Sequence, residues 1–265
     1  MNIAVYESYN RSNRSAGDYI GPDGLLYCGS CRRPKQARIE GFPGPVYISC
    51  SCMEAKQAAA DERERQKQIE DLRSYCLPSG SIRNHTFANA EAEKHIERAK
   101  RYVEHWEECK RRNLGVVFFG PTGTGKSFAA HCIANALIDK GIPVRYLSAV
   151  ELVSSLMDRE KRDDVLSGLT TIPLLIVDDL GAEHDSSFSR SMMCSVIDMR
   201  VESGRPLVIT TNYSLREMQR SPDHTLARTF DRILSACIPV AVTGESKRLK
   251  KAAENLRAAK ELLDL

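Results

Sequence analysis

The sequence of 265 residues lacks any apolar run long enough to cross a membrane, so we expect no contact with a membrane. Its first twenty residues are polar and hold no apolar segment of the kind found in secretory signals, which predicts a cytoplasmic protein. A strong charge of either sign is also missing, because the formal net charge is only +3. Overall charge therefore does not indicate nucleic-acid binding, and any such site has to come from local clusters.

The sequence does contain nine cysteines, and in a reducing compartment this number indicates metal ligands and small core residues rather than disulfides. Cys28, Cys31, Cys50 and Cys52 follow two short apolar runs in the spacing C-x2-C-x18-C-x-C, which resembles that of a zinc ribbon. Four thiolates would complete the tetrahedral coordination of Zn²⁺, so we expect a closed, structural site. Two pairs of free cysteines in an ordinary loop are the alternative.

Residues 53–75 contain no glycine or proline and are rich in Ala, Glu, Arg, Lys and Gln, a composition that favours helix. Their apolar positions are sparse and form no heptads, so we expect a solvated helical linker, with a partner-binding helix as the alternative. The run from Leu77 to Gly80 then breaks the helix. The sequence thus predicts a zinc-binding module with four cysteine ligands over residues 1–52, a linker over 53–75 and a large α/β domain over 76–265.

In the large domain, the apolar run 116–119 leads into G-x-x-x-x-G-K-S and then into a helix-forming segment. This strand, loop and helix context is the one that a phosphate-binding loop requires. Backbone N–H groups and the positive end of the helix dipole would bind phosphate oxygens. Lys126 would bridge the β- and γ-phosphates of ATP, and Ser127 would hold Mg²⁺. The predicted nucleotide-binding residues of this stretch are Gly120, Pro121, Thr122, Gly123, Thr124, Gly125, Lys126, Ser127 and Phe128.

Two later apolar runs end in polar groups. The run 173–177 is followed by Asp178 and Asp179, a pattern typical of a buried strand that presents carboxylates at its carboxyl end. Asp178 would hold Mg²⁺ through water, and Asp179 would polarise the attacking water. The run 207–211 is followed by Asn212, which could orient water against the γ-phosphate. Since strands and helices alternate, we expect a parallel sheet with these groups at the carboxyl ends of its strands.

Arg228 and Arg232 lie four residues apart, on one face of a predicted helix. They could pair with Asp231, or reach the nucleotide of a neighbouring subunit, where an arginine stabilises the charge of the transferring phosphoryl group. Two basic clusters could also contact DNA phosphates, with a solvated surface as the alternative. They consist of Arg159, Lys161 and Arg162, and of Lys247, Arg248, Lys250 and Lys251.

Three histidines, His131, His184 and His224, have no convergent partners in the sequence, so we expect each to be structural or exposed rather than catalytic. The remaining cysteines that fall in or beside apolar patterns are expected to be buried, as small hydrophobes. They are Cys109, Cys132, Cys194 and Cys237.

Together these motifs resemble the AAA+ ATPases of the DnaC/DnaI helicase-loader and IstB transposition-helper group. The resemblance covers about residues 76–251 and rests on Gly120–Ser127, Asp178–Glu183, Thr210–Asn212, Arg228–Arg232 and Gly244–Lys250. The N-terminal cysteine module looks more like that of the loaders than the transposition helpers. The fold that the resemblance implies is an AAA+ P-loop NTPase, with a five-stranded parallel sheet flanked by helices and a small zinc-ribbon-like module before it.

The function that the resemblance implies is that of a replication protein. Such a protein binds ATP and Mg²⁺, holds a hexameric replicative helicase and assists its loading onto single-stranded DNA. An IstB-like ATPase that binds DNA and directs a transposase is the alternative. A phosphate-loop enzyme acting on a small metabolite is a third possibility, which the paired arginines and the cysteine module disfavour.

The resemblance also implies residue roles. Asp178 and Asp179 take the Walker B roles, Asn212 is a nucleotide sensor, and Arg228 or Arg232 acts in trans in an ATP-dependent homo-oligomer. Many AAA+ proteins carry Glu where this chain has Asp179, so this departure from the general AAA+ pattern implies slow ATP hydrolysis.

By the same resemblance, His85 to Phe87 would lie near the base of the nucleotide. The chain continues only briefly beyond Gly244, so we expect no helical lid and no nucleotide-sensing role for Arg248.

Overall fold

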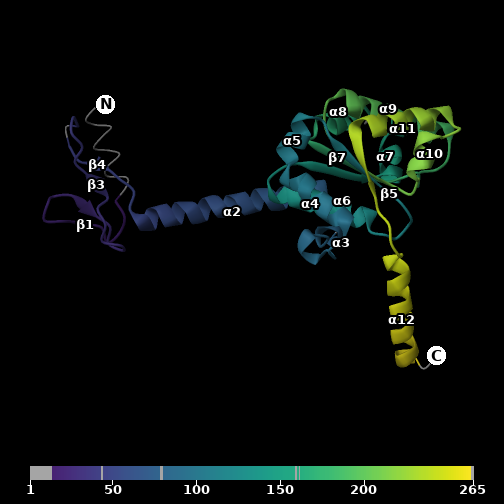
Figure 1. Cartoon of the computed structure of the whole chain (residues 1–265). Helices are drawn as coiled ribbons and strands as arrows, with labels where there is room; N and C mark the ends of the chain where they lie inside the picture. Colours follow the sequence, from purple (N-terminus) through teal and green to yellow (C-terminus); the bar gives the residue numbers. More distant parts are fainter. Residues whose placement is uncertain (1–13, 43, 78–79, 159, 161, 264–265) are drawn as a thin grey trace. The chain divides into compact units, whose positions relative to one another are not determined.

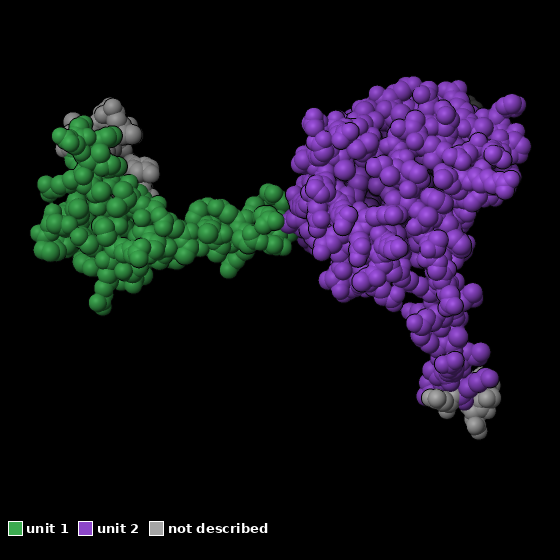
Figure 2. Space-filling view, viewed as in Figure 1, with its two compact units in different colours: residues 1–68 green, residues 69–265 purple. Residues whose placement is uncertain are grey.

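The computed structural model describes residues 14–42, 44–77, 80–158, 160 and 162–263. The chain divides into two compact units, Met1–Gln68 and Ile69–Leu265, which are coloured separately in Figure 2. This division falls inside helix α2 (Ser51–Cys76), whereas the sequence placed the domain boundary near residue 76. The reason is packing, because Ile69 and Cys76 are buried in the core of the larger unit while residues 54–68 of the helix are exposed.

The smaller unit contains two short antiparallel strand pairs, followed by the exposed part of α2 (Figure 1). Its strands are β1 (Tyr19–Ile20), β2 (Leu26–Tyr27), β3 (Gln36–Ala37) and β4 (Val46–Tyr47), with β1 paired to β2 and β3 paired to β4.

A buried ion pair ties the smaller unit together. Lys35 Nζ lies 2.6 Å from the Asp18 carboxylate, and the two side chains are only 1% and 2% exposed. Asp18 also accepts hydrogen bonds from the backbone N–H groups of Ser15 and Gly29. A unit with so small an apolar core thus relies on polar contacts to join its strands.

The larger unit is built on a five-stranded sheet in the order β6-β7-β8-β5-β9, and all of its strand pairs are parallel. This confirms the predicted sheet. The strands are β5 (Gly115–Phe119), β6 (Val144–Ser148), β7 (Leu174–Leu180), β8 (Leu207–Thr211) and β9 (Cys237–Ala241). Because β8 lies between β5 and β7, the glycine-rich loop, Asn212 and the two aspartates all lie at the carboxyl ends of neighbouring strands, at the same edge of the sheet.

Helices cover both faces of this sheet, as expected (Figure 1). Side chains alternate along each strand, so Phe118 packs in one core and Val117 in the other. The helical segments that contribute to the core with Phe118 are the end of α2, α3 (Gly80–Arg83), η1 (Phe87–Asn89), α4 (Lys94–Glu104), α5 (Trp106–Arg111) and α6 (Lys126–Asp139). Those on the opposite face are α7 (Ala149–Ser155), α8 (Arg162–Thr171), α9 (Ser187–Glu202), α10 (Leu215–Gln219) and α11 (His224–Ala236).

The last helix, α12 (Lys247–Leu263), exposes its apolar side chains, including Leu249 and Leu256. In the part of the chain that the structure describes, no helix combines the length and the apolar character that crossing a membrane requires.

Arg200 of α9 fixes the amino ends of the two strands that carry the polar groups. Its side chain is completely buried, and its guanidinium donates hydrogen bonds of 2.7–3.2 Å to the carbonyl oxygens of Leu169, Ile172, Pro173 and Pro206. Pro173 and Pro206 immediately precede β7 and β8. Burial lowers the pKa of Arg200 to about 10, so the group remains charged at neutral pH.

Candidate nucleotide-binding site and cysteine cluster

The loop that joins β5 to α6 has the backbone geometry that its glycines predict. Gly120, Gly123 and Gly125 have positive φ angles of 140°, 84° and 103°, which other residues adopt only with strain. Space is also restricted, because a Cβ on Gly120 would lie 2.2 Å from the Val242 carbonyl oxygen and one on Gly123 would lie 2.1 Å from Ser246 Oγ. The loop therefore tolerates only glycine at positions where its backbone turns back on itself.

Lys126, the first residue of α6, connects this loop to the end of β8. Its Nζ donates hydrogen bonds to the carbonyl oxygens of Gly120 and Pro121 at 2.8 and 2.7 Å and to Asn212 Oδ1 at 2.8 Å. Asn212 Nδ2 in turn donates to Asp179 Oδ1 at 3.4 Å. Burial lowers the pKa of Lys126, and the neighbouring aspartates oppose that shift. The structure thus brings a lysine, an amide and a carboxylate from three separate motifs into one cluster.

The two aspartates at the end of β7 have different environments. The register of β7 with β8 shifts before β7 ends, and Asp179 has a φ angle of 60°, a strained conformation for a residue with a side chain. Its backbone N–H donates to Thr210 Oγ1 at 2.9 Å. Asp178 is only 9% exposed, and its carboxylate accepts hydrogen bonds of 2.5 Å from the hydroxyls of Tyr146 and Thr210. The Asp179 carboxylate therefore contacts Asn212 in the cluster, whereas the Asp178 carboxylate is buried and bonded to the hydroxyls of Tyr146 and Thr210.

A cavity of about 370 Å³ opens beside this cluster. Its lining includes the predicted residues Thr122, Gly123, Gly125, Lys126, Ser127, Phe128, Asp179 and Asn212, together with His85, Asn89, Glu91, His131, Lys247 and Arg248. Of the other predicted residues, Gly120 and Pro121 contact Lys126, the Thr124 hydroxyl donates to the Pro121 carbonyl oxygen, and Asp178 lies under Tyr146 and Thr210. A larger depression of about 710 Å³ near Glu107 and Arg205 contains none of the predicted nucleotide-binding residues.

The start of α12 is hydrogen-bonded to the glycine-rich loop, a contact that the sequence did not lead us to expect. The Lys247 backbone N–H donates to the Gly123 carbonyl oxygen at 2.9 Å, and Lys247 Nζ lies 3.0 and 2.7 Å from the carboxylates of Glu91 and Glu93. Arg248, for which we expected no role at the nucleotide, lines the cavity beside it. Two adjacent basic residues after a glycine were the signal available in the sequence.

Two histidines and a tyrosine connect the cavity wall with Asp178, and His131, which we expected to be structural or exposed rather than catalytic, is buried among them. The Nδ1 atoms of His85 and His131 lie 2.8 Å apart, and His131 Nε2 lies 2.7 Å from the Tyr146 hydroxyl. These residues are distant in the sequence, so their spacing did not predict that they contact one another. Tyr146 could have been noticed, because it projects from β6 on the same face of the sheet as Asp178 on β7.

The two arginines do not contact the nucleotide cluster of their own chain. Arg228 Nη2 lies 2.6 Å and Arg232 Nε 2.9 Å from the carboxylate of Asp198 on α9. The Asp198 side chain is 13% exposed, whereas those of Arg228 and Arg232 are 64% and 41% exposed. A carboxylate on another helix, rather than Asp231 on their own, therefore orients both guanidinium groups.

Of the two basic clusters, Arg159 and Lys161 lie outside the described residues, as do Pro78 and Ser79 of the predicted helix break. Arg162 Nε donates to the Leu156 carbonyl oxygen at 2.8 Å. Lys250 and Lys251 are exposed on α12.

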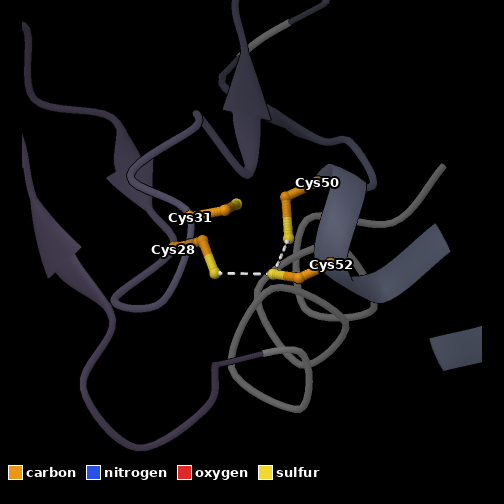
Figure 3. A group of neighbouring side chains, drawn as sticks. All are labelled: Cys28, Cys31, Cys50 and Cys52. Atoms are coloured by element: carbon orange, nitrogen blue, oxygen red, sulfur yellow. Dashed lines mark hydrogen bonds between the residues drawn. The ribbon is translucent and has the colours of Figure 1, made fainter. Parts of the chain in front are cut away.

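In the smaller unit, the four cysteines of the predicted zinc site lie together (Figure 3). Their Sγ atoms are all within 4.8 Å of one another, and Cys52 Sγ lies 3.3 Å from those of both Cys28 and Cys50. Tetrahedral coordination with Zn–S bonds of about 2.3 Å separates sulfur atoms by roughly 3.8 Å. The donor set and its dimensions therefore fit zinc.

The two cysteine pairs occupy different local structures. Cys28 and Cys31 lie in the turn after β2, whereas Cys50 follows β4 and Cys52 lies in the first turn of α2. This helical start accounts for the shorter C-x-C spacing. A backbone hydrogen bond from Arg33 lowers the pKa of Cys31 to about 6, whereas hydrogen bonds with Cys28 and Cys50 raise the pKa of Cys52 to about 12.

Comparison with known proteins places this site in a family. The model of the "IstB-like ATP binding protein" family matches residues 53–255. The replicative helicase loader DnaC of Escherichia coli (strain K12) is 26% identical over 130 residues, which are 47% of this chain and 52% of DnaC. The loader DnaI of Bacillus subtilis (strain 168) is 30% identical over 155 residues, or 52% of this chain and 48% of DnaI. The chain thus spans about half the length of these loaders.

A putative insertion sequence ATP-binding protein of Sinorhizobium fredii is 26% identical over 230 residues, which are 84% of this chain and 74% of that protein.

The solved structures agree on the fold. The crystal structure of DnaI gives a TM-score of 0.55 at 22% identity, and the match covers 65% of this chain and 95% of the chain in that structure. The crystal structure of the DnaC helicase loader gives a TM-score of 0.53 at 23% identity, and the match covers 62% of this chain and 100% of the chain in that structure. This likeness confirms the AAA+ P-loop fold that the motifs implied. Since the family model matches well over half of the chain, the protein belongs to the IstB-like ATP-binding family.

Proposed function

We propose that this protein binds ATP with Mg²⁺, hydrolyses it slowly and uses the nucleotide to control its hold on a replicative helicase during loading onto single-stranded DNA. The observation that carries the nucleotide part is the hydrogen bond of 2.8 Å between Lys126 Nζ and Asn212 Oδ1, beside Asp179. It joins the phosphate loop, the sensor position and the acidic strand end at one cavity.

In the proposed site each side chain has a distinct role. Lys126 would exchange its carbonyl and amide acceptors for oxygens of the β- and γ-phosphates. Ser127 would hold Mg²⁺ directly, and Asp178 would do so through water, because both of its oxygens already accept hydroxyl hydrogen bonds. Asp179 would polarise the attacking water and Asn212 would orient it. The short, strained Asp179 supports slow hydrolysis, since the carboxylate reaches less far than a glutamate.

The helicase part of the proposal rests on the two relatives named as replicative helicase loaders and on the cysteine-bearing unit that precedes the ATPase domain. We assign Zn²⁺ to Cys28, Cys31, Cys50 and Cys52, whose Sγ atoms converge within zinc-binding distances. The ion would supply folding free energy to a unit with little core of its own. The smaller unit would then serve as a rigid module for binding the helicase.

A pull-down with a hexameric replicative helicase tests this function. We expect ATP to change the amount of helicase retained, and Lys126→Ala to abolish that change while the zinc content stays the same. Lys100→Ala, on the exposed face of α4, is the matched control and should behave like the wild type. Failure to retain any helicase, with or without ATP, would refute the loader function, and normal ATP hydrolysis by Lys126→Ala would refute the assigned pocket.

A second function is favoured by the insertion sequence relative, because that similarity spans 84% of this chain. In this case the protein would bind DNA as an ATP-dependent assembly and direct a transposase. ATP-dependent binding to double-stranded DNA, together with no retention of helicase, would support this function over loading.

We also propose that Arg228 or Arg232 acts in trans within a homo-oligomer. Both guanidinium groups are more exposed than Asp198, which orients them, so a phosphate of a neighbouring subunit could reach them.

A further inference from the structure

A continuous line of hydrogen bonds runs from the cavity wall to Asp178. His85 lines the cavity, and its Nδ1 lies 2.8 Å from His131 Nδ1. His131 Nε2 lies 2.7 Å from the Tyr146 hydroxyl, which lies 2.5 Å from Asp178 Oδ2. The other oxygen of Asp178 accepts from the hydroxyl of Thr210. This line joins the segment before η1, helix α6 and the strands β6, β7 and β8, which are separate in the sequence.

Only one arrangement of donors and acceptors satisfies every hydrogen bond in this line. A carboxylate only accepts hydrogen bonds, so the Tyr146 hydroxyl donates to Asp178 and its oxygen must accept from His131 Nε2–H. Burial lowers the pKa of His131 to about 4 and also lowers that of His85, so both rings are neutral near pH 7. A neutral ring with a proton on Nε2 has a lone pair on Nδ1, and His131 Nδ1 therefore accepts from His85 Nδ1–H. His85 is left with a lone pair on Nε2.

Given the ATP site proposed above, we propose that His85 is a base-selecting residue whose Nε2 accepts a hydrogen bond from the amino group of adenine. A base that carries a carbonyl at the same edge, such as guanine, would meet lone pair against lone pair. Asp178 fixes this preference from a distance, because it determines the direction of every donor in the line. His131 and Tyr146 are positioning residues that carry the constraint from the acidic strand end to the base.

The packing of the cavity wall supports a base at this place. The ring centroids of His85 and His131 lie 4.9 Å apart at an interplanar angle of 28°, and with their Nδ1 atoms 2.8 Å apart the two rings meet edge to edge. Phe128 packs against His85 with ring centroids 4.9 Å apart. An acceptor fixed by the ring of Phe128 and by the hydrogen bond to His131 discriminates better than a mobile side chain.

Replacing Tyr146 should alter the preference for adenine over guanine, although Tyr146 does not line the cavity. Tyr146→Phe removes the oxygen that requires a proton on His131 Nε2. His131 can then carry its proton on Nδ1 and donate to His85, whose Nε2 becomes a donor. Base preference should therefore weaken or reverse in a variant with an unchanged cavity lining.

The test measures dissociation constants for ATP and GTP in the 265-residue chain by competition with a fluorescent nucleotide. His85→Phe should reduce the preference for ATP over GTP by about 3- to 10-fold, the range expected for one hydrogen bond. His85→Gln keeps an acceptor oxygen and should retain part of the preference. His105→Phe, at an exposed histidine, is the matched control and should change nothing. Measurement in EDTA as well as in Mg²⁺ separates base selection from any effect on the metal.

Tyr146→Phe should shift the preference by a similar factor, and the double variant with His85→Phe should show no further loss. Wild-type selectivity in Tyr146→Phe, or additive effects in the double variant, would overturn the proposed line. ATP binding with unchanged selectivity in His85→Phe would refute the role of His85 while leaving the ATP site intact. Absence of ATP binding by the wild type would instead refute the proposed function itself.

Discussion

Replacing Arg200 by Met should destabilise the larger unit strongly, although Arg200 lies at the opposite end of the strands from the nucleotide site. Its guanidinium is completely buried and donates to the carbonyl oxygens of Leu169, Ile172, Pro173 and Pro206. Methionine fills most of the same volume but donates nothing. The four carbonyl oxygens would then lose their donor, and those of Leu169 and Pro206 would do so in fully buried positions.

The magnitude follows from these contacts. Each buried acceptor left without a partner costs roughly 1 kcal/mol or more. The removal of a buried charge partly offsets this loss, since burial already lowers the pKa of Arg200 to about 10. We expect a net loss of about 3 kcal/mol in the free energy of unfolding. For a domain of this size, that loss corresponds to a fall in Tm of about 6–12 °C.

Urea unfolding of the chain, followed by tryptophan fluorescence, measures the stability of the larger unit specifically. The chain has a single tryptophan, Trp106, which is 2% exposed in the core of the larger unit. Arg98→Met, on the exposed face of α4, is the matched control and should change the free energy of unfolding by less than about 0.5 kcal/mol. A loss below about 1 kcal/mol in Arg200→Met would refute the reasoning, because the carbonyl groups would have found other partners.

Three further outcomes are expected. The pKa of His131 falls from 6.5 to about 4 on folding, so the unfolded chain binds more protons between these two pH values. The free energy of unfolding should therefore be about 2 kcal/mol lower at pH 5 than at pH 7. His131→Gln should remove this part of the pH dependence, and an unchanged dependence in that variant would contradict the assignment. Cys50→Ser should lower the zinc content from one ion per chain, measured by atomic emission after gel filtration, and retention of a full ion would exclude the four-thiolate site. Arg228→Ala or Arg232→Ala should reduce ATP hydrolysis at protein concentrations where chains associate, without changing ATP affinity; equal rates across a dilution series in the wild type would argue against any action in trans.

Much of the nucleotide site could be predicted from the sequence because its parts are local. The turn through Gly120 and Gly125 is set by the φ angles that contiguous residues can adopt, and Lys126 follows as the first residue of a helix. The strand that carries Asp178 was visible as an unbroken apolar run. Parallel strands then bring the ends of such runs to one edge, so the contact between Lys126 and Asn212 was expected in outline.

Other features depend on which surfaces pack together. Asp198 orients both candidate arginines from a different helix, although an intrahelical partner was equally plausible from the sequence. The boundary between the two units falls inside α2, because Ile69 and Cys76 find apolar partners in the larger core. Such partners have no fixed spacing along the chain, so periodicity does not reveal them.

The sequence by itself determined the phosphate loop, the acidic strand end and the four-cysteine cluster, since each is a short pattern whose geometry its own residues dictate. Only the tertiary structure decided that His85, His131 and Tyr146 form one line to Asp178. A hydrogen bond requires two groups within about 3 Å, and residues 46, 15 and 32 positions apart reach that distance only when the helix and strands that carry them are packed.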